Sequence, residues 1–424
     1  MFENTNVENP KLDSSVNSIY PYYAGYNPKF VDSVLDTTLI QNDGIVLDPW
    51  NGSGTTTSQA SKKGFNCYGI DINPVMIMLA KADLVPSSEK DSIIALTKNI
   101  INRFHKESYL NCIENEDPLL IWFQPRATGH LRLLQKIIND LLSLHSNENI
   151  NEFVNNISSY SALIHTAVLV SIRNLTTVFK SSNPTWIKKP KSKFQRINPS
   201  ANRIIKIFEQ SIYDVTEKSH YDSSKFSNAS VKLSVGSSSS TGIEDNKIDL
   251  IITSPPYCTR IDYAISTQIE LAYLNFTHLM FNELRNHMIG SSTISKKSFH
   301  HNEYLGDKVE FFLDQLKKHP SKASSSYYYK THRQYYSSVN QSLKHQQKVL
   351  RKNGGMVLVV QDSYYKEIHN DLQENIVELA ESNGLTLKKR FDFPSSRTMA
   401  NLHTSSKKYR NKKTVVESVL CFIK

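Results

Sequence analysis

Two short apolar runs near the start of the chain each end in an aspartate, and this pattern restricts the fold more than any other feature. Residues 44–48 (Gly-Ile-Val-Leu-Asp) lead into a glycine-rich turn at 49–57, and residues 66–71 form the second run. A helix over 74–84 is expected next, with Asn73 as its N-cap and a proline at its first position. A β-α-β-α start predicts a doubly wound, mostly parallel α/β sheet with its ligand site at the carboxyl ends of the strands.

The strand signal then lapses, and the spacing of apolar residues over 87–228 is mainly helical. We therefore predict a catalytic domain built from residues 1–86 and 229–424, with 87–228 as a large, mostly helical insertion. Strands return at 231–235, 248–253 and 355–360, and the runs at 386–393 and 415–423 are expected to close the sheet as an antiparallel pair. Helices are expected over 264–288, 335–350 and 371–382.

Positive charge is concentrated in long tracts rather than spread evenly. The formal net charge is +10, and residues 153–208 and 315–361 contain neither Asp nor Glu. Tracts of one sign concentrate a polyanion near the surface, and the nucleic acid backbone is the usual partner. Within the first tract, residues 181–196 are the best candidate for a contacting loop. Trp186 in this loop could stack on a base or wedge into a duplex, and a core tryptophan is the equal alternative.

Other compositional features exclude several classes of protein. No run of apolar residues is long enough to span a bilayer, and residues 1–17 do not resemble a secretion signal, so a cytoplasmic protein is expected. The four cysteines are scattered, with no CxxC and no histidine cluster at zinc spacing. We therefore expect no membrane contact and no metal.

The turn at 49–57 has the chemistry of a ligand site. Gly52 and Gly54 lack a Cβ, so the backbone can bend sharply and approach a ligand closely. The turn is not GxGxxG and has no lysine, which argues against a phosphate. Asp48 and Asp71 instead suit a ligand with an ammonium group and a ribose. Asp71 can accept hydrogen bonds from both ribose hydroxyls. The alternative for Asp71 is a charge at a helix N-terminus.

The tetrapeptide Ser254-Pro255-Pro256-Tyr257 directly follows the buried run 248–253. Two prolines make a rigid extended loop without backbone donors, so the Ser254 hydroxyl and the nearby carbonyls form an acceptor-rich edge. Such acceptors can hold the two N–H groups of an exocyclic base amine and direct its lone pair. Tyr257 offers a face for a base removed from its stack.

Together these motifs resemble those of the amino-methylating DNA methyltransferases. Residues 48–56 are similar to the family's cofactor motif, and 69–74 to its ribose-binding continuation. Residues 254–257 resemble its catalytic motif in the Ser form associated with N4-cytosine enzymes. The resemblance covers about 20–84 and 231–424. One departure is Gly236-Ser237, where the family usually has Gly-Asp, so an acidic contact to the cofactor's adenine amine is in doubt.

The resemblance implies a Rossmann-like, S-adenosylmethionine-dependent enzyme that methylates the N4 amine of a flipped cytosine in double-stranded DNA. Implied cofactor-binding residues are Tyr23, Lys29, Phe30, Asp48, Pro49, Trp50, Gly52, Ser53, Gly54, Thr55, Asp71, Ile72 and Asn73. The implied catalytic residues are Ser254, Pro255, Pro256 and Tyr257. Expected DNA contacts are Arg173, Lys180, Trp186, Lys188, Lys189, Lys191, Lys193, Arg196 and Arg260.

Several alternatives remain open on the sequence alone. The same enzyme could act on adenine N6, or on RNA bases, or the chain could be a DNA-binding protein with an inactive methyltransferase core. Arg260 could order the catalytic loop instead of touching DNA. A cognate restriction endonuclease, acting separately, is an expectation at the level of the family.

Overall fold

A central sheet of seven strands organises the molecule. The computed structural model describes residues 1–3, 5–11, 19–20, 25–41, 43–143, 149–181, 186–218, 229–258, 262–294, 303–395 and 415–424. The strands of the sheet are β1 (Ile45–Asp48), β2 (Asn66–Asp71), β3 (Val231–Val235), β4 (Ile248–Thr253), β5 (Leu350–Gln361), β8 (Thr386–Ser395) and β9 (Val415–Ile423).

The strand order is β3-β2-β1-β4-β5-β9-β8. In this order, each pair of neighbours among β3, β2, β1, β4 and β5 is parallel. Strand β9 runs antiparallel to both β5 and β8. The predicted α/β class, the parallel sheet and the closing antiparallel pair are therefore confirmed. A two-stranded hairpin, β6 (Ser363–Tyr365) and β7 (Ile368–Asn370), lies outside the main sheet.

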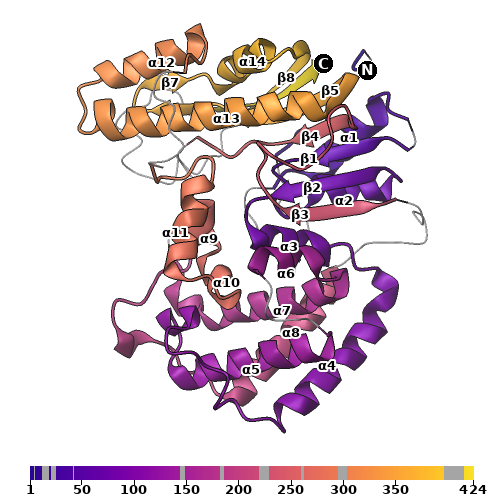
Figure 1. Ribbon diagram of the computed structural model, residues 1–424, viewed down its shortest axis with the longest axis vertical. Coiled ribbons are helices and arrows are strands. Elements are labelled where there is room, and N and C mark those ends of the chain that lie inside the picture. The colour runs from indigo at the N-terminus through magenta and orange to yellow at the C-terminus, as the bar shows by residue number, and fades with distance from the viewer. Residues whose placement is uncertain are drawn as a thin grey trace.

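Helices cover both faces of the sheet (Figure 1). Helices α1 (Pro28–Thr37) and α2 (Thr55–Lys62) cover one face, and α12 (Asp307–Lys318), α13 (Tyr329–Val349) and α14 (Leu372–Ser382) cover the other. Successive residues of a strand point to opposite faces. Accordingly, Val46 of β1 packs in the core beneath α1, while its neighbour Leu47 packs in the core beneath α13. This two-sided burial is why these strands read as continuous apolar runs.

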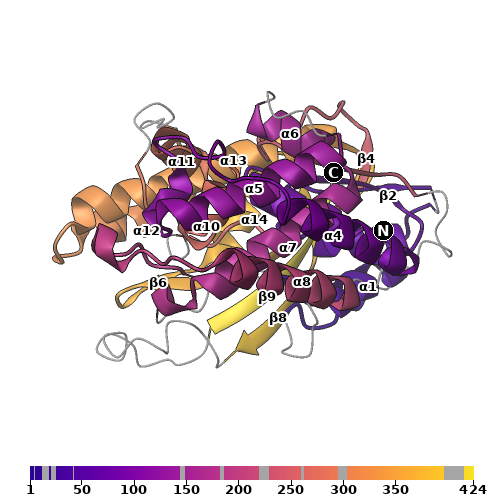
Figure 2. The same cartoon turned by 90° about the horizontal axis from the view of Figure 1, so that it is seen from below.

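A second group of helices extends the molecule at one end of the sheet (Figure 1), and it faces the viewer when the molecule is seen from below (Figure 2). Its members are α4 (Lys90–Phe104), α5 (Pro125–Leu141), α6 (Ile150–Asn156), α7 (Ser159–Leu175) and α8 (Ala201–Lys218). Helix α3 (Pro74–Ala82) joins this group to the sheet, because all of its residues are buried and most of them share one hydrophobic core with α5, α7 and α8. The buried Lys81 of α3 donates to the carbonyls of Asn155 and Ile157 at the end of α6.

The helix expected over 264–288 is in fact three helices, so that prediction was wrong. They are α9 (Tyr263–Ser266), α10 (Gln268–Tyr273) and α11 (His278–His287). Asn275 adopts a left-handed φ of 61° after α10, and asparagine is one of the few residues that tolerates this conformation. The side chain of Thr277 then accepts from the Met280 N–H and starts α11 in a new direction.

Within the part of the chain described, none of the helices combines the length and apolar character needed to cross a bilayer.

Candidate active site

The carboxyl ends of β2, β1 and β4 lie next to one another, because these three strands are neighbours in the sheet. The turn after β1, the segment after β2 and the proline loop after β4 therefore meet at one edge. They line a single cavity of about 620 Å³. Of the residues predicted to bind the cofactor, those that line it are Asp48, Pro49, Trp50, Gly52, Ser53, Thr55, Asp71, Ile72 and Asn73. All four predicted catalytic residues, Ser254 to Tyr257, line it as well.

Asp48 ties the turn to the proline loop. Its side chain is buried and accepts hydrogen bonds from the hydroxyl of Thr253 at 2.5 Å, from Tyr26 at 3.1 Å and from the backbone N–H of Trp50 at 3.1 Å. Thr253 is the last residue of β4 and directly precedes Ser254. Burial raises the pKa of Asp48, while these donors oppose that rise. Two segments about two hundred positions apart are thus held together by one carboxylate.

Asp71 closes β2 and faces the same cavity. Its two oxygens accept from the backbone N–H of Gly52, at 2.9 Å, and of Asn73, at 2.8 Å. Burial raises the pKa of Asp71 to about 6, against the effect of these two donors. An ionised carboxylate offers about four acceptor positions. After both backbone bonds are made, it keeps capacity for hydroxyl groups of a ligand.

The two glycines of the turn have different roles. Gly52 has a φ of 50° and lines the cavity, so it serves both the bend and the close approach of a ligand. Gly54 has a φ of 94° and does not line the cavity. A Cβ at Gly54 would lie 2.8 Å from the Cβ of Ala80, so this glycine lets the turn pack against α3.

In the proline loop, the hydroxyl of half-buried Ser254 donates to the carbonyl oxygen of Val359 in β5 at 2.9 Å. Since the hydroxyl proton is used in this bond, the lone pairs of Oγ remain to accept hydrogen bonds from a ligand. The Tyr257 N–H donates to the hydroxyl of Tyr263 at 3.3 Å. A Cβ at Gly290 would lie 2.4 Å from the carbonyl oxygen of Tyr257, so the loop also rests on this glycine.

Two helices form walls of the cavity that the sequence analysis did not predict. Met280, Glu283, Leu284 and His287 of α11 line it. From α13 come Gln334, Ser338, Gln341 and Ser342. These four polar residues recur at helical spacing among the buried Tyr335 and Tyr336, which is a signal that a search for polar stripes on helices would have found.

The segment after β3 supplies hydroxyls where an acidic contact was in doubt. Residues 235–239 line the cavity. The hydroxyls of Ser237 and Ser239 lie 2.9 Å apart, and that of Ser238 lies 2.8 Å from the hydroxyl of Ser342 in α13. This edge of the cavity therefore offers hydroxyl groups rather than a carboxylate.

The prediction for the segment before β1 needs correction. Lys29 is exposed, and Phe30 is fully buried in the core under α1; neither lines the cavity. The reason is that Asn27 caps α1, so the first helical turn points Lys29 to solvent and Phe30 inward. Tyr26 lines the cavity instead and bonds to Asp48 and Thr56. Tyr23 lies outside the described residues.

The basic residues predicted to contact DNA fall into two groups. Lys180, Lys188, Lys189, Lys191 and Lys193 are exposed, and Arg196 and Trp186 are half-buried. Arg173 is different: it is buried, with 7% of its surface exposed, and forms an ion pair with Glu270, so it is not available to a DNA backbone. Arg260 lies outside the described residues.

The loop that carries these lysines is anchored at both ends. Lys188 donates its N–H to the carbonyl of Phe179 at 2.8 Å and accepts from the indole of the buried Trp122 at 3.0 Å. Near the other end, the carbonyl of Arg196 accepts from Gln124. Between these anchors a 3-10 turn, η4 (Lys193–Gln195), presents Phe194 with 97% of its surface exposed. Partial burial of its ammonium group and the neighbouring Arg285 of α11 lower the pKa of Lys189, although the residue as a whole is exposed.

Comparison with known proteins gives consistent matches. Residues 4–82 match the family model described as DNA methylase. The chain is 24% identical over 332 residues to the Type II methyltransferase M.BsoBI of Geobacillus stearothermophilus, covering 70% of this chain and 61% of that protein. It is 34% identical over 91 residues to the Type II methyltransferase M.MjaII of Methanocaldococcus jannaschii, covering 22% of this chain and 16% of that protein. The chain thus spans about three-fifths of the first of these relatives.

Among solved structures, a crystal structure of a SAM-dependent methyltransferase from Methanosarcina mazei aligns with a TM-score of 0.28 and 9% identity, over 91% of this chain and 94% of that chain.

Proposed function

We propose that this chain is an amino-methylating DNA methyltransferase, which its matches to the DNA methylase family model and to Type II methyltransferases support. In this proposal it transfers a methyl group from S-adenosylmethionine to an exocyclic amine in double-stranded DNA. We propose further that the amine is the N4 amine of a cytosine turned out of the duplex. The observation that carries this proposal is the hydrogen bond from Thr253 to Asp48, which joins the glycine turn and the proline loop around one cavity.

The cavity suits the cofactor in size and in donor chemistry. Its volume of about 620 Å³ lies within the roughly 300–1,000 Å³ typical of small-molecule sites. Asp71 would accept hydrogen bonds from the ribose hydroxyls, and the backbone of Gly52 would pass close to the ligand. When bound, S-adenosylmethionine supplies a methyl group on a positively charged sulfur, which an amine nitrogen can attack directly.

The proline loop would hold the amine that is methylated. Ser254 directs its hydroxyl proton to Val359, so its oxygen is free to accept one amine N–H, and the Pro255 carbonyl would accept the other. Tyr257 would stack on the extruded base. Holding the amine in one orientation lowers the entropic cost of the transfer, a contribution that can reach several kcal/mol, roughly 7–11 in well-oriented intramolecular reactions.

The helical region would hold the duplex. The loop with Lys188, Lys189, Lys191 and Lys193 presents its charges to solvent beside α11, and phosphates are the natural counter-ions. Phe194 at the tip of this loop is exposed and would insert between bases, in the way apolar side chains wedge into unstacked DNA. We therefore assign residues 87–228 to target recognition.

Replacing Ser254 with alanine tests the catalytic assignment. We expect Ser254→Ala to bind S-adenosylmethionine normally and to lose about tenfold or more in turnover, because one acceptor for the amine is removed. The assay is transfer of labelled methyl to duplex DNA, followed by mass spectrometry of the nucleosides. Ser382→Ala is a matched control, since this exposed residue on α14 also donates its hydroxyl to a backbone carbonyl.

The same assay decides between the target bases. N4-methylcytosine in the product supports the proposal, and N6-methyladenine would replace it with the adenine enzyme. Transfer to RNA and not to duplex DNA, or no transfer to any nucleic acid, would overturn it. A Type II restriction endonuclease that cuts the same site is a further part of the proposal, and DNA methylated by this protein should resist that endonuclease.

A further inference from the structure

A short segment after the proline loop connects three parts of the molecule. It consists of α9 and α10 and spans residues 263–273. Its first residue, Tyr263, lines the cavity and accepts the N–H of Tyr257. Four residues later, the Thr267 hydroxyl accepts from the side chain of Asn73 at 2.9 Å and donates to the Tyr263 carbonyl. The segment therefore contacts both the proline loop and the end of the predicted cofactor motif.

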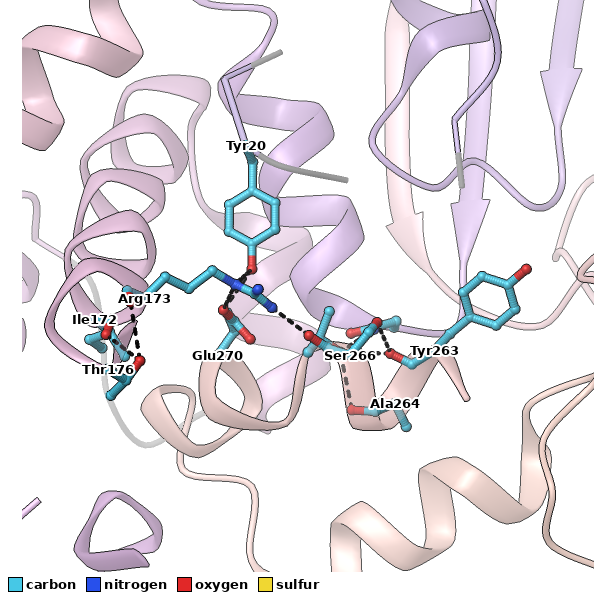
Figure 3. A network of polar contacts seen from close by, with 10 residues as sticks. Tyr20, Ile172, Arg173, Thr176, Tyr263, Ala264, Ser266 and Glu270 are labelled. Carbon is cyan, nitrogen blue, oxygen red and sulfur yellow. Dashed lines mark hydrogen bonds and ion pairs between the residues drawn. The ribbon is translucent and has the colours of Figure 1, made fainter. Parts of the chain in front are cut away.

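Arg173 of α7 holds this segment from the helical region (Figure 3). Its Nε donates to Glu270 Oε1 at 2.5 Å and to the Tyr20 hydroxyl, and its Nη2 donates to the Ser266 carbonyl at 2.5 Å. The Tyr20 hydroxyl in turn donates to the same Glu270 oxygen at 2.6 Å. In Figure 3 the guanidinium lies between Tyr20 and Glu270, while the ring of Tyr263 points away from it.

These contacts are buried, so a side chain that replaces Arg173 must reproduce the same hydrogen bonds without help from water. Glu270 is fully buried and Arg173 is 7% exposed. A buried carboxylate without its cation is strongly disfavoured. Two separate nitrogens of the guanidinium, Nε and Nη2, serve Glu270 and the Ser266 carbonyl at once, in a planar arrangement that an ammonium group does not reproduce. A lysine at position 173 would keep the charge but lose one of these contacts.

A second buried arginine holds the opposite end of α10. Arg132 of α5 pairs with Asp117 and donates to the carbonyls of Ala272 and Tyr273. It is 6% exposed, almost the same as Arg173. It lies at the end of the segment away from Tyr263, which makes it a natural control for a change at Arg173.

We propose that Arg173 and Glu270 are positioning residues, which fix the α9–α10 segment so that Tyr263 holds the backbone of Tyr257 in the site. The helical region, to which we assign DNA recognition, would thereby control the geometry of the proline loop. The catalytic part of this inference rests on the proposed function. The structural part, a mechanical link from Arg173 to Tyr257, does not.

Hydrogen exchange tests the structural part without any activity assay. In Arg173→Lys we expect peptides within 254–258 and 262–267 to exchange at least about fivefold faster than in the parent, and peptides of β1 and α2 to be unchanged. Arg132→Lys should accelerate exchange near 272–276 and leave 254–258 at the parental rate. Equal protection of 254–258 in Arg173→Lys and the parent would overturn the proposal.

A double-mutant cycle tests the catalytic part. Tyr263→Phe removes the acceptor of the Tyr257 N–H. We expect this variant and Arg173→Lys each to lower kcat about tenfold, with the dissociation constants for S-adenosylmethionine and DNA within about twofold of the parent. If Arg173 acts through Tyr263, the double variant will be no slower than the slower single variant. A double variant whose loss equals the product of the two single losses would show independent roles and refute the link.

One further variant and the activity of the parent protein distinguish a failed variant from a failed proposal. If Arg173→Lys does not fold, Tyr20→Phe replaces it in both experiments, because it removes one hydroxyl from the Glu270 network and leaves the ion pair. If the parent protein transfers no methyl group to DNA, the proposed function is wrong, while the exchange experiment still decides whether Arg173 supports Tyr257.

Discussion

Individual side chains in this site are defined by what they donate and accept. The Ser254 hydroxyl donates a hydrogen bond to the Val359 carbonyl, which leaves the lone pairs of its oxygen to accept from the ligand. The Asp48 carboxylate joins the Thr253 hydroxyl to the glycine turn. In both cases the residue type follows from the sequence. In each case the hydrogen-bond partner that orients the side chain is a residue more than a hundred positions away.

Asp71 leads to a prediction about pH. Its pKa is raised by burial to about 6, so its carboxylate is ionised above that pH and gains a proton below it. A protonated carboxyl group keeps fewer and weaker acceptor positions for the ribose hydroxyls than the carboxylate does. We therefore expect the dissociation constant for S-adenosylmethionine to be constant at neutral and alkaline pH and to rise as the pH falls through about 6, as measured by calorimetric titration.

Asp71→Asn separates this effect from other titrations. The amide should weaken binding about tenfold to hundredfold at pH 8, from the roughly 1.5–3 kcal/mol associated with hydrogen bonds to a charged group. It should also abolish the pH dependence near 6. Asp91→Asn, at an exposed position on α4, is the control and should titrate like the parent. A persistent pH dependence in Asp71→Asn would assign the effect to another group.

At the level of the elements, the structure shows why some segments were predictable and others were not. The helix at 74–82 follows from its cap and its proline, and the side chain of Asn73 does accept from the Val75 N–H. The break between α10 and α11 depends on one residue, Asn275, in a left-handed conformation, which apolar periodicity over 264–288 cannot reveal. The walls formed by α11 and α13 come from segments that meet the cavity only after folding.

The loop between Trp186 and Arg196 leads to a prediction about DNA binding. Phe194→Ala should weaken binding to a duplex about fivefold to hundredfold, from the roughly 1–3 kcal/mol of one base-stacking contact. Lys188→Ala and Lys193→Ala should each reduce the slope of log affinity against log salt by about one. Fluorescence anisotropy with a labelled duplex measures both effects.

The control for this loop is Phe311→Ala on α12, which removes another exposed aromatic residue, 66% exposed, outside the basic tracts. It should bind DNA as the parent does. If Phe194→Ala and Phe311→Ala bind equally well, the tip of the loop does not insert into DNA, and the lysines alone would account for the attraction.

For the whole molecule, the position of α3 has a thermodynamic consequence. Chains of this size often unfold in separate steps. Here α3 belongs both to the layer against the sheet and to the core of the helical region, and Lys81, Arg132 and Arg173 add polar links across that boundary. We therefore expect one cooperative thermal transition in differential scanning calorimetry.

The cofactor gives an independent check on this expectation. S-adenosylmethionine at about a hundred times its dissociation constant should stabilise the folded state by roughly 2.7 kcal/mol and move the whole transition to higher temperature. Two transitions, with only one of them moved by the ligand, would mean that the helical region unfolds separately from the sheet.

The sequence alone determined the features that depend on neighbours along the chain. Local patterns of this kind fix strand, turn and helix. They are the apolar runs ending in Asp48 and Asp71, the glycine turn, the capped helix after Asn73 and the proline loop at Ser254. From them the parallel sheet and the meeting of two motifs at its edge could be predicted, because the carboxyl ends of neighbouring parallel strands share one edge.

Only the tertiary structure decided how distant side chains are used. Arg173 lies in a basic tract and suggests a DNA contact, yet it is buried against Glu270, which is 97 residues further along the chain. Phe30 lies in the core rather than in the cavity, and α13 supplies a wall that only a polar stripe marks in the sequence. Charge and residue type are written in the sequence, but burial and partners depend on packing between segments far apart in the chain, which no local pattern contains.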